Sequence, residues 1–167
     1  MIIIADPPWR YSFSLSKANK IENQYPTLTV PEICALPGTS GFPELENNSA
    51  LYLWATAPKL REALTVMDAW GFTYKSNMVW DKELLGMGYW ARGQHEHVLI
   101  GTKGKHSPPT PKSRRSSVIR RKRGRHSVKP VDLHDHIDNA FPGETKVELF
   151  ARDTRPGWIT WGNEVGV

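Results

Sequence analysis

The residues best suited to chemistry are Asp6-Pro7-Pro8-Trp9, which directly follow an apolar run at residues 1–5. Each proline fixes its own φ and lacks an N–H group, so we expect the carbonyls of Asp6 and Pro7 to need hydrogen-bond donors from outside the turn. A base with an exocyclic amine offers two N–H donors and a flat face that can stack on tryptophan. The motif therefore predicts a site for an amino-bearing aromatic ring.

The elements that must position this motif alternate between strand and helix. Apolar or alternating runs predict strands over residues 1–5, 50–56, 73–80, 96–102 and 145–152, with a short one at 118–119. Helices are predicted after Thr29, whose capping box includes Glu32, from Pro58 to Gly71, and from Pro130 to Phe141. The alternation favours one α/β domain over residues 1–167, with a mostly parallel sheet and helices on both faces. Ligands of such sheets bind where strands end, which is where residues 6–9 lie.

Composition excludes several classes of protein. With 167 residues, 39% of them hydrophobic, the chain is long enough to bury a core. Its single cysteine, Cys34, allows neither an internal disulfide nor a four-cysteine zinc site, and we predict no metal site elsewhere. No apolar stretch approaches the ~20 residues of a membrane span. The apolar start is too short for a signal peptide and no basic region precedes it, so we expect a cytoplasmic protein without membrane contact.

Basic residues are concentrated in residues 103–129, which hold 11 of the 22 Lys and Arg residues and no Asp or Glu. The rest of the chain carries 11 basic against 17 acidic residues, so this segment supplies the whole excess of +5. Its densest part runs from Arg120 through Arg121 and Lys122 to Arg123. Such local charge binds polyanions, and arginine matches phosphate geometry, so we predict a phosphate-binding arm that contacts nucleic acid. The alternative is a solvated loop or a mobile insertion.

Several segments, in this order, resemble the MT-A70 family of adenine N6-methyltransferases, in the form found in bacteria and phages. The Asp-Pro-Pro-Trp motif is followed by similar segments at residues 25–28, 51–54, 79–82, 95–101, 129–130, 146–152 and 156–164. The resemblance covers nearly the whole chain. It implies a Rossmann-like fold that binds S-adenosylmethionine with its motifs in permuted order, the catalytic turn first and much of the cofactor site last. The sequence agrees in having no Gly-x-Gly-x-x-Gly after the first predicted strand.

The resemblance also implies which residues bind the cofactor. Lys129 would face its methionine carboxylate, and Asp6 would receive its amino group or lie beside it. Arg152, Asn163 and Glu164 would surround its ribose. Only five residues precede Asp6, so we expect the pocket for the adenine of the cofactor to be built differently from that of relatives or to be looser.

The same resemblance assigns catalysis to Asp6, Pro7, Pro8 and Trp9. Hydrogen bonds from the N6 amine to the Asp6 carboxylate and the Pro7 carbonyl would offset the positive charge that develops on nitrogen, and Trp9 would stack on the base.

Other residues are predicted to contact the acceptor. Tyr25 is a candidate wall of the base pocket or simply a loop anchor. Lys82, Glu96 and His95 line the acceptor site or form an ordinary surface salt bridge. Residues Arg120, Arg121, Lys122 and Arg123 bind the backbone of the nucleic acid.

Three functions remain open at this point. The first is N6-adenine methylation of DNA, the usual substrate of bacterial and phage relatives, which we favour. The second is the same reaction on RNA. The third is a nucleic-acid-binding subunit without activity, which the retention of both Asp6 and Trp9 argues against. The chain is short for a separate target-recognition domain, so we expect weak sequence preference, a homodimer or a second methyltransferase-like subunit.

Overall fold

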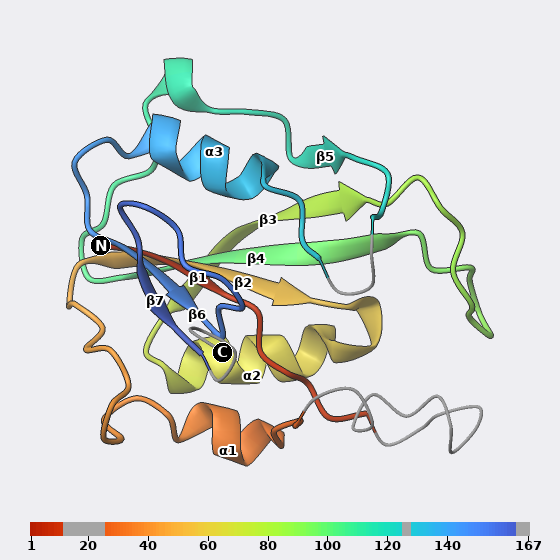
Figure 1. Cartoon of the computed structure of the whole chain (residues 1–167), viewed down its shortest axis with the longest axis horizontal. Coiled ribbons are helices and arrows are strands. Elements are labelled where there is room, and N and C mark those ends of the chain that lie inside the picture. The colour runs from red at the N-terminus through yellow and green to blue at the C-terminus, as the bar shows by residue number, and fades with distance from the viewer. Residues whose placement is uncertain (12–25, 125–127, 163–167) are drawn as a thin grey trace.

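The computed structural model describes residues 1–11, 26–124 and 128–162, and its centre is a seven-stranded sheet with the order β5-β3-β4-β2-β1-β6-β7 (Figure 1). The strands are β1 (Ile2–Ala5), β2 (Ser49–Ala55), β3 (Thr73–Asp81), β4 (His95–Lys103), β5 (Val118–Arg120), β6 (Lys146–Leu149) and β7 (Ile159–Trp161). The helices are α1 (Val30–Cys34), α2 (Leu60–Ala69) and α3 (Asp132–Ala140), with 3-10 turns η3 (Ala57–Lys59) and η4 (Pro111–Ser113).

Most neighbouring strands are parallel, as the alternation of elements predicts. Strand β1 pairs in parallel with both β2 and β6, and β6 with β7. Strand β4 is the exception, because it runs antiparallel to both β2 and β3. The predicted α/β class with a mostly parallel sheet is therefore confirmed, with one reversed strand inside it.

The sheet is covered on both faces because successive side chains of a buried strand point to opposite sides. Ile3 and Ala5 belong to the core that includes buried residues of α1 and α2, whereas Ile2 and Ile4 belong to the core under α3. Figure 1 shows α1 and α2 on one side of the sheet and α3 on the other. Both faces of β1 are buried, which explains its unbroken run of apolar residues.

Local signals placed most elements correctly. Thr29 and Glu32 form the predicted capping box of α1. Gly71 lies just after the C-cap of α2 and has a φ of 82°, which stops the helix from continuing. The predicted strand at 145–152 is wrong in its second half. Strand β6 ends at Leu149, because Phe150 takes a φ of 63° and turns the chain out of the extended conformation.

Two further strands lie at the ends of the sheet. Strand β7, which the sequence did not predict, has only three residues and pairs with the end of β6. Strand β5 lies within the basic segment and pairs with β3 through residues 79–81. At least part of the basic segment is thereby tied to the sheet.

All strands except β4 run in one direction, so their carboxyl ends meet at one edge of the sheet. This edge, here called the carboxyl edge, carries Asp6 at the end of β1 and the loops that follow β2, β3 and β6. Within the described parts of the chain, no helix has the length and apolar character needed to cross a membrane.

Candidate active site

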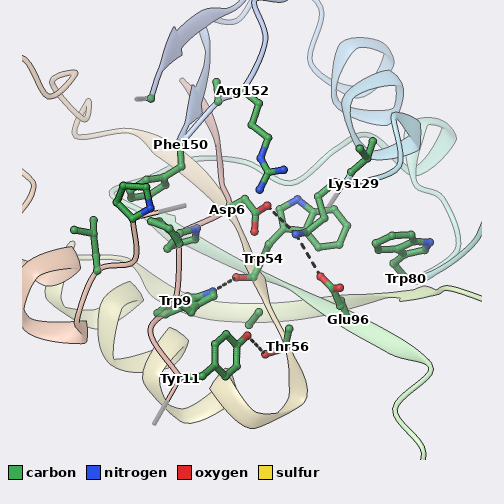
Figure 2. A pocket seen from close by; sticks show the side chains of 18 of the residues that line it. Asp6, Trp9, Tyr11, Trp54, Thr56, Trp80, Glu96, Lys129, Phe150 and Arg152 are labelled. Atoms are coloured by element: carbon green, nitrogen blue, oxygen red, sulfur yellow. Dashed lines mark hydrogen bonds and ion pairs between the residues drawn. The ribbon is translucent and has the colours of Figure 1, made fainter. Parts of the chain in front are cut away.

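A cavity of about 420 Å³ opens at the carboxyl edge, around the turn that follows β1. It is lined by residues from segments far apart in the sequence: Asp6, Pro7, Pro8, Trp9, Tyr11, Pro26, Leu28, Trp54, Ala55, Thr56, Trp80, Glu96, Arg123, Val128, Lys129, Phe150, Ala151, Arg152, Trp161 and Gly162. Figure 2 shows the side chains of Asp6, Lys129, Glu96 and Arg152 together on one side of it. Its size falls in the range typical of small-molecule sites.

The turn itself is fixed by backbone hydrogen bonds on both sides. The Asp6 N–H donates to the carbonyl of Leu149 (3.4 Å), and the Leu28 N–H donates to the carbonyl of Pro8 (2.9 Å). The expectation that the Pro7 carbonyl needs a donor from outside the turn is wrong, because it accepts from the Trp9 N–H at 2.8 Å. A carbonyl oxygen has two lone pairs, so one remains for a ligand.

Trp9 is a wall of the cavity and also part of the core. Its side chain is only 5% exposed, and its Nε1–H donates to the carbonyl of Trp54 at 3.2 Å (Figure 2). A bridge between Trp9 and Leu28 fixes its backbone as well. These contacts anchor the turn, and they leave little of the indole free to stack on a ligand.

Charged side chains form a chain of ion pairs along one wall. Lys129 Nζ lies 2.7 Å from Asp6 Oδ2 and 3.4 Å from Glu96 Oε2, and Lys82 Nζ lies 3.3 Å from Glu96 Oε1. Burial alone would lower the pKa of Lys129, but the carboxylates of Asp6 and Glu96 outweigh it and raise that pKa above its usual value. Lys129 is thus a permanently charged ammonium at the cavity, and its two carboxylate partners compensate it.

Aromatic residues form the rest of this wall. The Lys129 ammonium lies 5.4 Å from the centre of the Trp54 ring, in the geometry of a cation–π contact. Trp80 packs edge-on against Trp54, and its Nε1–H donates to the carbonyl of Arg121 at 2.8 Å. Trp54 is a core residue that also lines the cavity, and it was not among the predicted site residues. The signal was available, because both tryptophans stand at the carboxyl ends of predicted strands.

The segment after β6 contributes further residues to the cavity wall. Arg152 lines the cavity, and Figure 2 shows its side chain extending toward Asp6. The positive φ of Phe150 redirects the chain just before it, and strained backbone of this kind is typical of functional sites. Gly162 lets β7 approach closely, since a Cβ there would lie 2.7 Å from the Ala151 nitrogen and closer still to its carbonyl oxygen. Phe150 and Gly162 were not predicted as site residues.

The four residues of the predicted phosphate arm take different positions. Arg123 lines the cavity, and its Nε is the one buried side-chain polar atom without a hydrogen-bond partner among the described residues. Arg121 forms an ion pair with Asp132, with Nη2 at 3.2 Å from Oδ1. Arg120 and Lys122 are exposed and do not line the cavity. A buried guanidinium N–H without a partner is costly, and this unsatisfied donor belongs to a residue that lines the cavity.

The remaining predicted residues are partly accounted for. Lys82 and Glu96 form a salt bridge, but it is not the exposed surface pair of the second alternative, because both side chains are largely buried and Glu96 lines the cavity. Tyr25, Asn163 and Glu164 lie outside the described residues, so their predicted roles stay predictions.

Comparison with known proteins finds relatives over almost the whole chain. The MT-A70 family model matches residues 1–164. The Type II methyltransferase M.MunI of Mycoplasma sp is 34% identical over 98% of this chain and 77% of its own length. The N(6)-adenosine-methyltransferase MT-A70-like protein of Drosophila melanogaster is 30% identical over 98% of this chain and 26% of its own length. The N(6)-adenosine-methyltransferase catalytic subunit METTL3 of Homo sapiens is 28% identical over 98% of this chain and 28% of its own length.

The chain therefore spans most of the bacterial relative but only about a quarter of the animal ones. Its first strand, its acidic turn and the paired lysine all fall within the matched region. The chain belongs to the MT-A70 family of adenine N6-methyltransferases.

Proposed function

We propose that this protein transfers a methyl group from S-adenosylmethionine to the N6 nitrogen of adenine in DNA. The observation that carries the proposal is the Asp6–Lys129 pair, held at 2.7 Å on the wall of a cavity that the Asp-Pro-Pro-Trp turn itself forms. This places a carboxylate, an ammonium and flat apolar surfaces around one space, as a charged nucleoside cofactor and an amino-bearing base require.

The residues present fit S-adenosylmethionine. Its methionine part carries one ammonium and one carboxylate, which can replace the Asp6–Lys129 pair so that each buried charge keeps an opposite partner. Glu96 lies 3.4 Å from Lys129 and would hold the Lys129 ammonium in place, whether that ammonium faces Asp6 or the cofactor carboxylate. Arg152 would contact the ribose of the cofactor. Asn163 and Glu164, which lie outside the described residues, are the other proposed contacts of that ribose. The unpaired Nε of Arg123 offers a further donor to the acceptor strand.

When bound, the cofactor would supply a methyl group on a positively charged sulfur, and the N6 nitrogen, which would give up one proton, would be its acceptor. The protein positions the acceptor and compensates its charge. Asp6 and the free lone pair of the Pro7 carbonyl would accept from the two N6–H groups, which orients the nitrogen and stabilises positive charge on it. In this proposal Trp9 acts mainly by holding the turn rigid through its bond to Trp54, because only a small part of its indole is exposed for stacking on the base.

The arrangement of strands supports the permuted motif order. The catalytic turn follows β1, the first strand of the chain, and the proposed cofactor residue Arg152 follows β6, one of the last two. Because β1 and β6 are parallel neighbours, their ends bring these two segments together at the carboxyl edge.

DNA is favoured over RNA by the relatives. The one named a type II methyltransferase is the more similar and is covered over 77% of its length, whereas the chain covers 28% of the human adenosine methyltransferase subunit. RNA is the second candidate, because the relatives named adenosine methyltransferases also align over 98% of this chain.

A substrate panel tests the proposal. The protein is incubated with labelled S-adenosylmethionine and matched single-stranded DNA, duplex DNA and RNA, and nucleosides are analysed by mass spectrometry. We expect N6-methyladenine in DNA and none with the Asp6→Ala variant, which should still bind nucleic acid. Faster methylation of RNA than of DNA would make RNA the favoured substrate. No N6-methyladenine in any substrate, together with retained binding, would indicate a binding subunit without activity.

A further inference from the structure

The connection between β3 and β4 presents an unusual amount of apolar surface to solvent. Within residues 83–94, here called the apolar hairpin, Met87 is 79% exposed, Tyr89 78% and Trp90 fully exposed, and Leu84 and Leu85 are exposed as well. Figure 1 shows this hairpin projecting beyond the sheet. Exposed large apolar residues scattered singly are ordinary, but five within seven positions of one hairpin indicate a binding surface.

The hairpin is held in a defined shape. The Gly86 N–H donates to the Gly93 carbonyl at 2.8 Å, and Arg92 Nε donates back to the Gly86 carbonyl at 2.6 Å. At its base, the Lys82 N–H donates to the Gln94 carbonyl at 2.9 Å. Gly88 approaches Ala91 so closely that a Cβ there would overlap the Ala91 carbonyl oxygen. The apolar tip is thus presented by a built turn.

The base of the hairpin is shared with the active site and with the basic segment. Trp80 and Glu96, which flank it on β3 and β4, both line the cavity. The Arg123 N–H donates to the Lys82 carbonyl at 3.0 Å, and the Arg121 N–H to the Asp81 carbonyl at 3.2 Å. Any polyanion that these arginines bind therefore runs past the foot of the hairpin.

We propose that the tip of the apolar hairpin, with Trp90 at its centre, is a wedge that stacks among the bases of the nucleic acid next to the extruded adenine. This inference rests on the proposed function, because a base must leave the duplex stack to reach Asp6. Extrusion leaves neighbouring bases without stacking partners, and an inserted aromatic or apolar side chain replaces that contact. A tryptophan on a rigid turn loses little conformational freedom when it does so.

Charge favours nucleic acid over a second copy of the chain as the occupant. The hairpin itself is neutral, with Glu83 and Arg92, but it stands beside the segment that supplies the whole net charge of +5. Two copies meeting through their hairpins would bring two such segments together and repel, whereas a polyanion is attracted to both features.

Photocrosslinking tests the contact without requiring methyl transfer. The full chain is bound to a mixed-sequence duplex that carries 5-iodouracil in place of thymine, irradiated, and mapped by mass spectrometry. We expect the main crosslink at Tyr89 or Trp90 and at least a fivefold loss in the Tyr89→Ala/Trp90→Ala double variant. Tyr74→Ala is the matched control, because Tyr74 is an exposed aromatic at the opposite end of β3. Crosslinks that map only elsewhere would overturn the proposal.

Kinetics test the role of the wedge. Trp90→Ala should slow methylation of duplex DNA about tenfold, equivalent to ~1.4 kcal/mol, and methylation of single-stranded DNA less than threefold. Trp90→Phe should recover most of the rate. A mismatch opposite the target adenine should reduce the difference in rate between Trp90→Ala and the wild-type chain. Equal effects on both substrates would overturn the wedge, as would light scattering that shows Trp90→Ala dissociating an oligomer. Absence of methylation by the wild-type chain, with the crosslink retained, would instead refute only the proposed function.

Discussion

Two clusters of charged groups lie at opposite ends of the central strand β1, and they differ in their surroundings. At the carboxyl edge, Lys129 lies between Asp6 and Glu96. At the amino edge, Glu144 lies between the amino group of Met1 at 3.1 Å and His106 at 3.0 Å. Each cluster joins segments that are more than a hundred residues apart in the sequence.

The carboxyl-edge cluster borders a cavity, a residue with positive φ and a guanidinium Nε without a partner. The amino-edge cluster is part-buried to a similar degree, and its His106 lines a second cavity of about 470 Å³. Its groups, however, satisfy one another and a backbone carbonyl, that of Asn48. Ion pairing over a long sequence separation is therefore no sign of function by itself. Among the described residues, a buried donor without a partner, on a residue that lines the neighbouring cavity, distinguishes the first cluster from the second.

The largest expected difference concerns Asp6. Asp6→Asn keeps the shape of the side chain but removes its charge, so we expect methyl transfer to fall on the order of 10²–10³-fold, the usual cost of losing one electrostatic contact to the reacting group. The fold should persist, because Glu96 still compensates Lys129. Initial rates with labelled cofactor and a circular dichroism melt measure the two effects. A rate within tenfold of wild type would contradict the proposed role.

Lys129 should affect cofactor binding and stability together. Lys129→Met removes the ammonium and leaves Asp6 and Glu96 without their shared partner, so we expect cofactor affinity to fall at least tenfold. The free energy of unfolding should fall by about 2 kcal/mol, as for loss of a charged hydrogen-bond partner. Titration calorimetry and chemical denaturation measure these quantities. A variant with unchanged affinity would place the cofactor carboxylate elsewhere.

Gly162 should tolerate no side chain. In Gly162→Ala the new Cβ would meet the backbone of Ala151, so β7 must move away from β6 at the cavity wall. We expect a loss of roughly 1–3 kcal/mol in the free energy of unfolding and a severalfold weaker cofactor affinity. Gly124→Ala is the matched control, because nothing lies within 4 Å of the position where its Cβ would be. Equal behaviour of the two variants would refute the close-approach argument.

The smallest effect should come from the amino edge. Burial alone would raise the pKa of Glu144, but hydrogen bonds from His106 and the amino group of Met1 outweigh it and lower that pKa below 4.5. The interaction therefore stabilises the fold above pH 4.5, and this contribution is lost as the pH falls through the folded-state pKa.

Glu144→Gln should remove this acid-sensitive contribution, which for a partly exposed pair is at most about 1 kcal/mol. Methyl transfer at neutral pH should not change. Unfolding curves at pH 7 and at successive values below 4.5 measure the first effect. A Glu144→Gln variant with impaired transfer would remove the distinction between the two clusters.

Prediction from sequence succeeded where a signal was local. The capping box of α1, the glycine after α2 and the buried run of β1 were read from neighbouring residues, and each is present. It failed at β7 and at the end of β6, because a strand of three residues is too short to show a periodic pattern and a single positive φ leaves none in the chain.

The same division holds for the candidate site. The residue types at the turn around Asp6, the family and the location of the excess positive charge could all be read from the sequence. The structure was needed to see which cation faces Asp6, that Trp9 is fixed to Trp54, and that Arg123 lines the cavity whereas Arg121 is paired with Asp132. Side-chain types and spacing report what a residue can do, but partners more than a hundred residues away are set by the order and direction of strands in the sheet.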